Sequence, residues 1–268
     1  HPTGDYVVYS VNKTIQVFHA IQDERVEVID LASDIVVYQP ESKKVITSEL
    51  LETNDFETFP SFSPDGKTLY FSSSAFQKIP EDYKEIRYNL CAIAFDPETM
   101  TFGDHVDTLV NAAAMGKSIS YARPSPDGKY IMFTLSDYGN FSIWHKEADL
   151  WLYNLKDGSL REMKEVNSDD VESYHSWSSE GTWFVFSSRR LDGLYTRPFF
   201  ACINEEGKIS KPFLLPQKRP LEFYNMTFFS YNVPEFVTGP VDWDLGEVEK
   251  MLTGGKRDSI EYLNIQNN

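Results

Sequence analysis

The chain has 268 residues, of which 41% are hydrophobic and 15% aromatic; this is ample material for a packed core and argues against disorder. Its 41 acidic and 25 basic residues give a net charge of −16, which argues against nucleic acid and anionic lipid as partners, because both need a basic surface. No segment reads as a signal peptide or a transmembrane span, and because the chain begins inside a repeat we expect it to be a mature or cleaved fragment.

A short pattern recurs four times along the chain. It is clearest at residues 63–72 and 125–134, which both begin Ser-Pro-Asp-Gly-Lys, and it is looser at residues 1–10 and 178–187. Proline, aspartate and glycine at the second, third and fourth positions favour a type I turn, and the apolar run that follows predicts a strand buried on both faces. In three copies an aromatic residue precedes the turn serine by four positions, namely Phe59, Tyr121 and Tyr174.

Each copy continues with two more predicted strands separated by a polar turn, so that one repeat supplies four strands. Four-stranded repeats at this spacing are typical of β-propeller blades. The predicted blades cover residues 1–53, whose inner strand is missing, 54–116, 117–168 and 169–216. The predicted fold class is therefore all-β, a β-propeller with four blades visible in this chain, and we expect them to be part of a ring of about six to eight blades.

Residues 217–268 follow the last blade. Leu221–Tyr231 reads as one more strand, which we expect either to supply the missing inner strand of the first blade or to belong to a further blade. Asp244 has the character of an N-cap and predicts a short helix over residues 244–253. Residues 256–268 are expected to form a loose tail.

The run from Phe62 to Ser73, with its Phe-Ser-Pro-Asp-Gly-Lys core, resembles the repeat of the TolB-like, WD40-like (PD40) β-propeller family. Residues 187–198 and 230–240 also resemble exported TolB-like proteins of Bacteroidetes-type bacteria. The resemblance implies a propeller in the periplasm or at the outer membrane, with a lipid anchor as an open alternative. It implies no single activity, since related blades serve periplasmic scaffolds, peptidases and polysaccharide lyases.

Strand direction alternates within a blade, so the loops between second and third strands should all lie on one face, opposite the tight Ser-Pro-Asp-Gly turns. These loops cover residues 11–33, 74–88, 136–148 and 188–197. Because binding residues concentrate on loops held by a rigid scaffold, we expect this loop face to be the functional face.

The last of these loops carries the most suggestive cluster. Arg189, Arg190 and Arg197 could clamp a carboxylate or a phosphate, with Asp192 and Tyr195 beside them. In the alternative, which we favour, the arginines pair with acidic residues of this chain such as Asp192 and pin the loop.

The loop at 136–148 contributes an aromatic group, Tyr138, Phe141 and Trp144. These rings could form a stacking platform for a sugar or a peptide. In the alternative, the loop folds its own hydrophobic residues beneath itself.

Three histidines, His19, His145 and His175, could also meet on the loop face. Because the sequence has no HxxxH or HExxH spacing, we expect structural roles for them and assign no metal site, cofactor or catalytic residue. The turn aspartates Asp65 and Asp127 are assigned to their own turns in the same way.

These features favour a non-enzymatic protein of the cell envelope that binds a protein or peptide partner, or a glycan, through its loop face. The alternative is a glycan- or peptide-processing enzyme of the propeller lyase or peptidase type, with its site at the channel mouth. The chain has no GxSxG nucleophile elbow, phosphate-binding glycine loop or dinucleotide fingerprint. A metal held by histidine and carboxylate groups on the loop face would favour the enzyme, and a broad apolar and charged surface would favour the binding protein.

Overall fold

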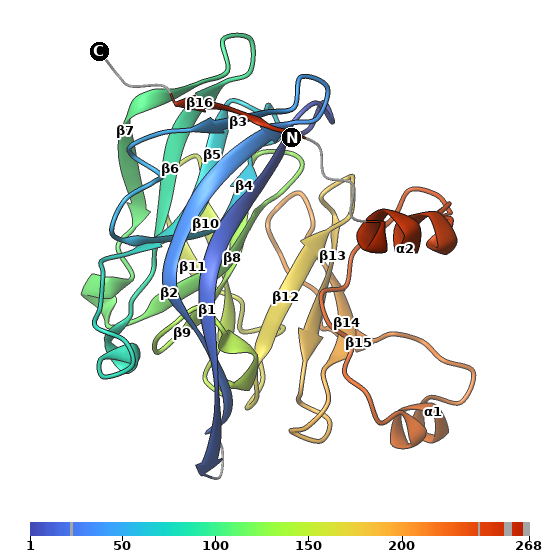
Figure 1. Cartoon of the computed structure of the whole chain (residues 1–268). Helices are drawn as coiled ribbons and strands as arrows, with labels where there is room; N and C mark the ends of the chain where they lie inside the picture. Colours follow the sequence, from blue (N-terminus) through green and yellow to red (C-terminus); the bar gives the residue numbers. More distant parts are fainter. Residues whose placement is uncertain (22–23, 241, 255–258, 265–268) are drawn as a thin grey trace.

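The computed structural model describes residues 1–21, 24–240, 242–254 and 259–264, and the side chains of residues 18–26 and 264 lie outside this description. Its strands form an open arc of twisted sheets (Figure 1). The strands are β1 (Val7–Ile21), β2 (Glu24–Gln39), β3 (Lys44–Thr47), β4 (Phe56–Phe62), β5 (Thr68–Ser74), β6 (Asn89–Asp96), β7 (Thr101–Val110), β8 (Ser118–Pro124), β9 (Tyr130–Ser136), β10 (Asp149–Asn154), β11 (Leu160–Glu162), β12 (Glu172–Trp177), β13 (Trp183–Ser188), β14 (Arg197–Cys202), β15 (Phe213–Leu214) and β16 (Glu261–Asn264). The helices are η1 (Tyr83–Glu85), η2 (Ala113–Met115) and η3 (Ser142–Trp144), which are 3-10 turns, and α1 (Pro220–Met226) and α2 (Leu245–Thr253).

Three groups of four strands form antiparallel meanders, which we call blade 2 (β4–β7), blade 3 (β8–β11) and blade 4 (β12–β15). The first strands of these blades, β4, β8 and β12, pack side by side along the inside of the arc. Blade 1 consists of β1, β2 and β3. This arrangement confirms the predicted fold class, an all-β partial propeller with four-stranded blades.

The Ser-Pro-Asp-Gly turns form as their chemistry predicts. The Ser63 hydroxyl donates to Asp65 Oδ1 at 2.5 Å, and the Lys67 N–H donates to the same oxygen at 3.1 Å. Gly66 closes the turn through its N–H to the Ser63 carbonyl at 2.9 Å and adopts a φ of +71°, where a Cβ would be strained. The copy at residues 125–130 repeats these contacts, so the carboxylate of each turn aspartate acts within its own turn.

The strands that follow these turns are buried on both faces, as predicted. Leu69 and Phe71 pack into the core between blades 1 and 2, whereas Tyr70, between them, faces the core that blade 2 shares with blade 3. Phe184 and Phe186 of blade 4 are fully buried in the core shared with blade 3. Each blade is thus held to the next by apolar side chains, the main favourable contribution to folding.

Blade 1 corrects one expectation. The segment 11–33, predicted to be a loop, is mostly a long hairpin in which β1 and β2 continue as an antiparallel pair (Figure 1). The physical reason is visible in the sequence, because polar and β-branched apolar residues alternate through residues 14–17 and 25–28, which is the strand period. The hairpin extends along the loop face toward blade 3.

The C-terminal region corrects a second expectation. Residues 221–226, predicted to start a strand, belong to helix α1, which begins with Pro220 at a favoured first position and contains no β-branched residue. Helix α2 forms as predicted, with Asp244 Oδ1 accepting the N–H groups of Gly246 and Glu247. Within the tail, expected to be loose, β16 pairs in parallel with β3 at the outer edge of blade 1. The remaining tail residues, 256–258 and 265–268, lie outside the described residues.

Candidate functional site

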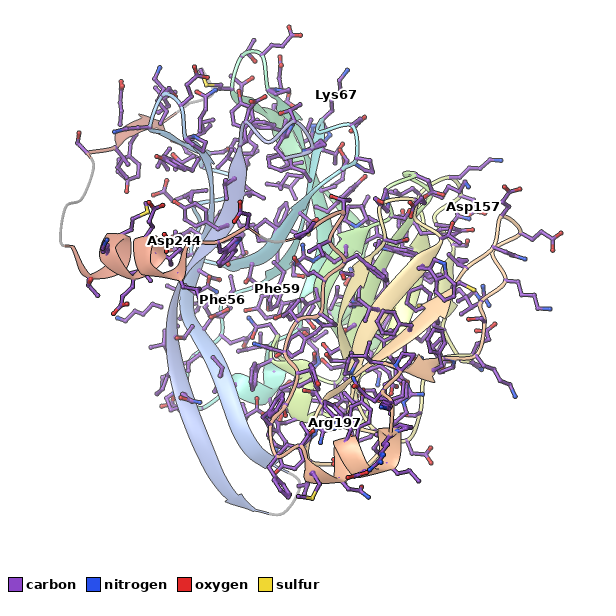
Figure 2. The ribbon with its side chains drawn as sticks, turned by 90° about the vertical axis from the view of Figure 1, so that its right-hand side faces the viewer. Phe56, Phe59, Lys67, Asp157, Arg197 and Asp244 are labelled. Atoms are coloured by element: carbon purple, nitrogen blue, oxygen red, sulfur yellow. The ribbon has the colours of Figure 1, made fainter. Side chains whose placement is uncertain are left out.

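The inner strands of blades 2, 3 and 4 each carry one aromatic side chain that contacts its counterpart in the next blade. The ring centroids of Phe59 and Tyr121 are 4.4 Å apart, and those of Tyr121 and Tyr174 are 4.7 Å apart. We call this row, Phe59–Tyr121–Tyr174, the axial ladder. Figure 2 shows Phe59 near the middle of the molecule.

All three ladder residues have a left-handed backbone, with φ of 50°, 56° and 48° in chain order. Each lies at a register irregularity of its inner strand. Such a backbone conformation costs an aromatic residue about 1–3 kcal/mol. The packing and hydrogen bonds around the ladder must therefore stabilise it by at least this amount. Burial, together with the neighbouring Tyr121, raises the pKa of Tyr174, and its hydroxyl therefore stays protonated at neutral pH.

On the turn side of the axial ladder lies a cavity of about 700 Å³, which we call the axial cavity. Residues from all four blades and from the segment after α1 line it, among them Phe62, Arg123, Trp177, Glu235 and Phe236. The lining residues Ser61, Arg123 and Ser176 each stand two positions after a ladder residue. The repeat therefore builds the ladder and the cavity wall together.

Arg123 is the polar centre of this cavity. Its side chain is half-buried, and its guanidinium makes no hydrogen bond or ion pair with any residue that the structure describes. The indole N–H of Trp177 donates to the Arg123 carbonyl at 3.1 Å, which fixes an aromatic wall beside it. An unpaired guanidinium next to aromatic and proline side chains suits a ligand that joins a carboxylate to an apolar group.

The arginines predicted on the loop face are engaged by this chain. Arg189 is 5% exposed, and its guanidinium lies 3.6 Å from the centre of the Trp144 ring. Its Nη1 donates to the carbonyl of Ile143 at 3.1 Å, and its Nη2 donates to the carbonyl of Gly193. Arg189 thus joins the loop of blade 4 to the loop of blade 3.

Arg190 belongs to a buried ion pair. Its Nη2 lies 2.7 Å from Glu172 Oε1, and the same oxygen accepts the hydroxyls of Ser168 and Ser188. Burial raises the pKa of Glu172, although the charge of Arg190 and the two hydroxyls oppose this effect. Removing Arg190 would leave a buried carboxylate without its counter-charge.

Arg197 is 1% exposed and fastens helix α1 and the segment after it to blade 4 (Figure 2). It donates to the carbonyls of Tyr224, Thr227 and Phe229 at 3.3, 2.7 and 2.6 Å. We call residues 227–236 the strap, because they continue across blade 4 toward the axial cavity.

Asp192 and Tyr195 shape the loop that precedes Arg197. Asp192 Oδ1 accepts the N–H of Tyr195 at 2.8 Å, and its Oδ2 lies 4.0 Å from Arg197 Nη2. The guanidinium of Arg197 stands 5.1 Å from the centre of the Tyr195 ring. These contacts agree with the alternative in which the arginines pair with groups of this chain and hold the loop in place. A role of the cluster in partner binding stays a prediction.

The ring of His145 lies between two carboxylates. Its Nε2 is 3.3 Å from Glu27 Oε1 and its Nδ1 is 3.0 Å from Glu147 Oε1, and the Tyr138 hydroxyl donates to Glu27 Oε1 at 2.7 Å. Burial alone would lower the pKa of His145, but the hydrogen bonds and charges of the two carboxylates outweigh burial and raise this pKa to about 9. Because Glu27 belongs to the β1–β2 hairpin, this protonated histidine ties the hairpin to blade 3.

A second buried carboxylate makes a parallel tie. Asp30 accepts a hydrogen bond from Asn140 Nδ2 at 2.6 Å and a longer one, 3.5 Å, from the Tyr88 hydroxyl. Burial raises the pKa of Asp30 despite these donors. The hairpin is therefore attached to the loops of both blades 2 and 3.

Phe141 and Trp144 do not form an open platform. They pack with Tyr121 and Tyr174 of the axial ladder and with the buried Ile143. This is the arrangement of the alternative, in which the loop covers its own hydrophobic residues, and stacking of a ligand on these rings stays a prediction.

Of the three predicted histidines, the structure describes the side chains of His145 and His175, and these two have separate partners. His175 is fully buried, with Nε2 2.9 Å from the Met132 carbonyl, and burial lowers its pKa to about 3. The side chain of His19 lies outside the described residues. Within the described residues, no group of three histidine, cysteine, aspartate or glutamate side chains is arranged to hold a metal ion.

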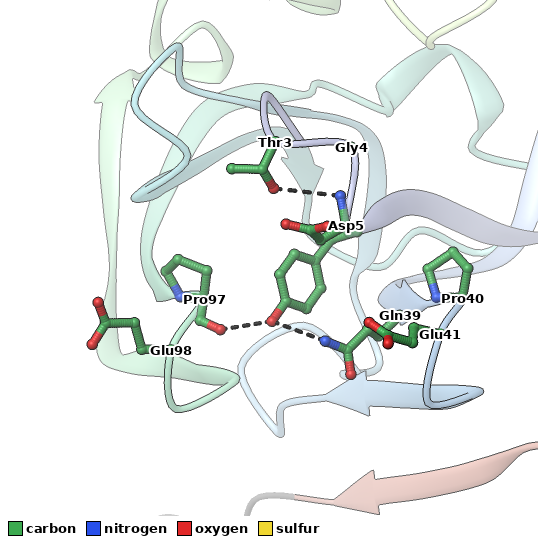
Figure 3. Close-up of a pocket in the computed structure, with 9 residues that line it drawn as sticks. Thr3, Gly4, Asp5, Gln39, Pro40, Glu41, Pro97 and Glu98 are labelled. Atoms are coloured by element: carbon green, nitrogen blue, oxygen red, sulfur yellow. Dashed lines mark hydrogen bonds between the residues drawn. The ribbon is translucent and has the colours of Figure 1, made fainter.

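A second hollow, of about 570 Å³, opens on the turn face between blades 1 and 2 (Figure 3). The Tyr6 hydroxyl donates to the Pro97 carbonyl at 2.6 Å and accepts from Gln39 Nε2 at 3.3 Å. Acidic side chains from three separate turns lie along it: Asp5, Glu41 and Glu98. Among the residues that the structure describes, no cationic side chain lines this hollow, which distinguishes it from the axial cavity.

Sequence reasoning missed Arg123 and Trp177. Both stand at fixed offsets from the turn serine, just as the ladder aromatics do, so the available signal was the repeat itself. The prediction placed the functional groups on the variable loops, whereas the cavity is built by the constant part of each blade.

No protein-family model matches the chain, and no curated protein matches it significantly. Solved structures that resemble it include TolB from Acinetobacter baumannii, with 17% identity over 77% of this chain and 53% of that one and a TM-score of 0.41. An oligogalacturonate lyase in complex with manganese has 10% identity over 72% of this chain and 50% of that one, with a TM-score of 0.49. The β-propeller domain of the Trilobed protease from Pyrococcus furiosus has 13% identity over 61% of this chain and 44% of that one, with a TM-score of 0.36.

This chain therefore spans about half the length of these structures. At such identities and TM-scores the similarities carry no information about activity, ligand or partner.

Proposed function

We propose that this chain is a non-enzymatic binding propeller of the cell envelope, which takes a peptide segment of a protein partner into the axial cavity. The observation that carries the proposal is the unpaired guanidinium of Arg123 inside a cavity walled by Phe62, Trp177 and Phe236. A volume of about 700 Å³ lies within the range of ordinary ligand sites and can hold a few residues of an extended peptide.

Electrostatics supports a ligand that carries a carboxylate. The chain has a net charge of −16, so an acidic partner is repelled at a distance, and a single carboxylate is attracted only where a cation is locally unpaired. Arg123 provides such a place. The expected ligand is therefore a mainly neutral or basic segment with one carboxylate beside an aromatic or aliphatic residue.

The loop face, predicted from the sequence as the binding face, remains a second candidate surface. Arg189 and Arg197 are buried against this chain and Arg190 is paired with Glu172, so partner contact there would have to use exposed groups such as Asp192. The axial cavity is therefore the first candidate for the binding site, and the loop face is the second.

Location in the cell envelope is part of this proposal and rests on the resemblance of the repeat to TolB-like propellers. In the described part of the chain, no helix is long and apolar enough to cross a membrane. Fractionation of a producing bacterium, with this chain detected by antibody, tests the location.

Selection from a random peptide library on the immobilised protein tests the binding site. Selected peptides should lose about tenfold to a hundredfold in affinity for Arg123→Ala, since a charge-assisted hydrogen bond is lost. Arg219→Ala is the matched control, because Arg219 is an exposed arginine paired with Glu222, and it should bind the peptides normally. Equal binding by both variants would exclude the cavity, and cleavage of selected peptides or of polysaccharides would favour the enzyme alternative.

A further inference from the structure

The axial cavity contains a second charged side chain, the carboxylate of Glu235 in the strap. Glu235 is exposed, and it makes no hydrogen bond or ion pair with any residue that the structure describes. Arg123 lines the same cavity and is also unpaired within the described residues, so two opposite charges line one space without neutralising each other. A ligand that satisfies Arg123 therefore lies within the field of a carboxylate.

The main chain of the strap is fixed on both sides of Glu235. The Ser176 hydroxyl donates to the Pro234 carbonyl at 2.7 Å, which ties the residue before Glu235 to the inner strand β12. The residue after it, Phe236, packs edge-on against Phe200 of β14, with ring centroids 5.8 Å apart. Glu235 is thus an ordered part of the cavity wall.

The main chain of Arg123 is fixed as well. Arg123 belongs to β8 and lies opposite Met132 of β9, and its carbonyl accepts the indole N–H of Trp177 at 3.1 Å. Both charges are therefore carried by an ordered main chain. This is the arrangement of a preorganised binding site, which loses little conformational freedom when a ligand binds.

The size of the cavity limits how far apart two charges of a ligand can be. A volume of about 700 Å³ corresponds to a sphere about 11 Å across, and an extended peptide advances about 3.4 Å per residue. A cationic side chain one to three residues from a carboxylate can therefore reach Glu235 while the carboxylate lies on Arg123. Phe62, Trp177 and Phe236 supply apolar walls for the residues between these charges.

Electrostatics distinguishes this ligand from other carboxylates. A ligand with two or more carboxylates is repelled both by Glu235 and by the net charge of −16. A ligand with one carboxylate and no cation satisfies Arg123 but supplies no partner for Glu235. A ligand with one charge of each sign pairs with both groups and binds most favourably.

The residues that carry this argument lie well inside the chain. His1 and Pro2 also line the cavity, but the two charges and the aromatic walls come from residues 62–236. Arg123 belongs to blade 3 and Glu235 to the strap, and the structure describes both of these elements throughout. The two charges therefore do not depend on the inner strand that blade 1 lacks.

We propose that Glu235 determines the specificity of the axial cavity by selecting a cationic group near the carboxylate of the ligand. This inference rests on the function proposed above and names its ligand class, a peptide with a lysine or arginine one to three residues from a carboxylate. The carboxylate binds Arg123 and the cation binds Glu235. An apolar residue of the peptide packs against Trp177 and Phe236.

Four short peptides test this ligand class. The probes are acetyl-Gly-Lys-Ala-Phe with a free carboxyl end, the same peptide with glutamine or with glutamate in place of lysine, and the lysine peptide with an amidated end. In calorimetry the lysine peptide should bind about three- to tenfold more tightly than the glutamine peptide and at least about tenfold more tightly than the glutamate peptide. Amidation should weaken binding by about tenfold or more. Equal binding of the lysine, glutamine and glutamate peptides would overturn the inference.

Variants of Glu235 assign the preference to this residue. Glu235→Gln should reduce the advantage of the lysine peptide over the glutamine peptide to less than about twofold, and Glu235→Lys should reverse the preference so that the glutamate peptide binds best. Glu206→Gln is the matched control, because Glu206 is an exposed carboxylate in the turn between β14 and β15, and it should keep the wild-type preference. If Glu235→Lys weakens all three peptides equally, Glu235 acts only on the structure of the strap and the inference is overturned.

The outcomes separate this inference from the proposed function. If the lysine and glutamine peptides bind equally and both are lost in Arg123→Ala, the cavity binds a carboxylate and only the role of Glu235 is wrong. If neither peptide binds at millimolar concentration, both proposals are wrong. The natural protein from its source cells, with any residues that precede His1, should show the same preference. If it does not bind the lysine peptide, a segment of its own chain occupies the cavity and the inference is overturned.

Discussion

His145 Nε2 lies 3.3 Å from Glu27 Oε1 and joins the hairpin of blade 1 to the loop of blade 3. These two blades are not neighbours in the arc, so the pair acts as a brace across the loop face (Figure 1). The side chains of His145 and Glu27 are 5% and 8% exposed, and solvent screens their interaction only weakly.

The stability that this brace contributes should fall in alkaline solution. The pKa of His145 is raised from 6.5 to about 9, so above about pH 6.5 the folded protein keeps a proton that the unfolded chain releases. The contribution is therefore complete below about pH 6.5 and is lost as pH rises through about 9, by about 3 kcal/mol. Urea unfolding of the wild type and His145→Gln should show a large difference near pH 6 and a small one near pH 10. A difference that does not change with pH would contradict the brace.

Glu57 should destabilise the protein above neutral pH. The residue is 3% exposed; Oε1 accepts the Thr53 hydroxyl at 2.6 Å, but Oε2 has no hydrogen-bond partner in the described structure. Burial raises the pKa of Glu57 to about 7, so the free energy of unfolding falls as pH rises from 4.5 through about 7. Glu57→Gln should raise Tm at pH 8 by about 2–6 °C and flatten its pH dependence in calorimetry. Glu52→Gln, an exposed neighbour, is the control and should change neither.

Arg197→Met should release the strap from blade 4. It removes the donors to three main-chain carbonyls from a fully buried position, which should cost about 2–4 kcal/mol and speed hydrogen exchange at residues 227–231. Arg219→Met, at an exposed ion pair, should change stability by less than about 0.5 kcal/mol. An unchanged Tm together with lost partner binding would instead support the ligand role predicted from the sequence.

Asp127→Ala should weaken one turn without affecting ligand binding. Asp127 Oδ1 accepts the Ser125 hydroxyl at 2.6 Å and the Lys129 N–H at 3.1 Å, and losing these bonds should cost about 1 kcal/mol in urea unfolding. The exposed Asp169→Ala should cost less than about 0.5 kcal/mol. A loss of peptide binding by Asp127→Ala at unchanged stability would contradict the purely structural role assigned to the turn aspartates.

Local chemistry explains which parts of the structure could be predicted. A Ser-Pro-Asp-Gly turn is determined by its own backbone preferences and by hydrogen bonds within five residues, and a run such as Leu69-Tyr70-Phe71 must be buried wherever it lies. Helix α2 was predicted for the same reason, since the Asp244 cap accepts the N–H groups of the residues two and three positions after it. The all-β class and the four-stranded repeat follow from these local signals.

Tertiary structure decided everything that depends on a distant partner. Whether Arg197 faces solvent or main-chain carbonyls depends on α1 and the strap, about thirty residues later in the chain. The segment after α1 lies as a strap across blade 4 because Arg197, Ser176 and Ser187 donate hydrogen bonds to its carbonyls. The left-handed backbone of Tyr121 is stable only where Phe59 and Tyr174 pack on either side of it. The sequence by itself determined the blades, because their turns and buried strands are local; only the packing of blade on blade decided which charged and aromatic groups remain free to bind.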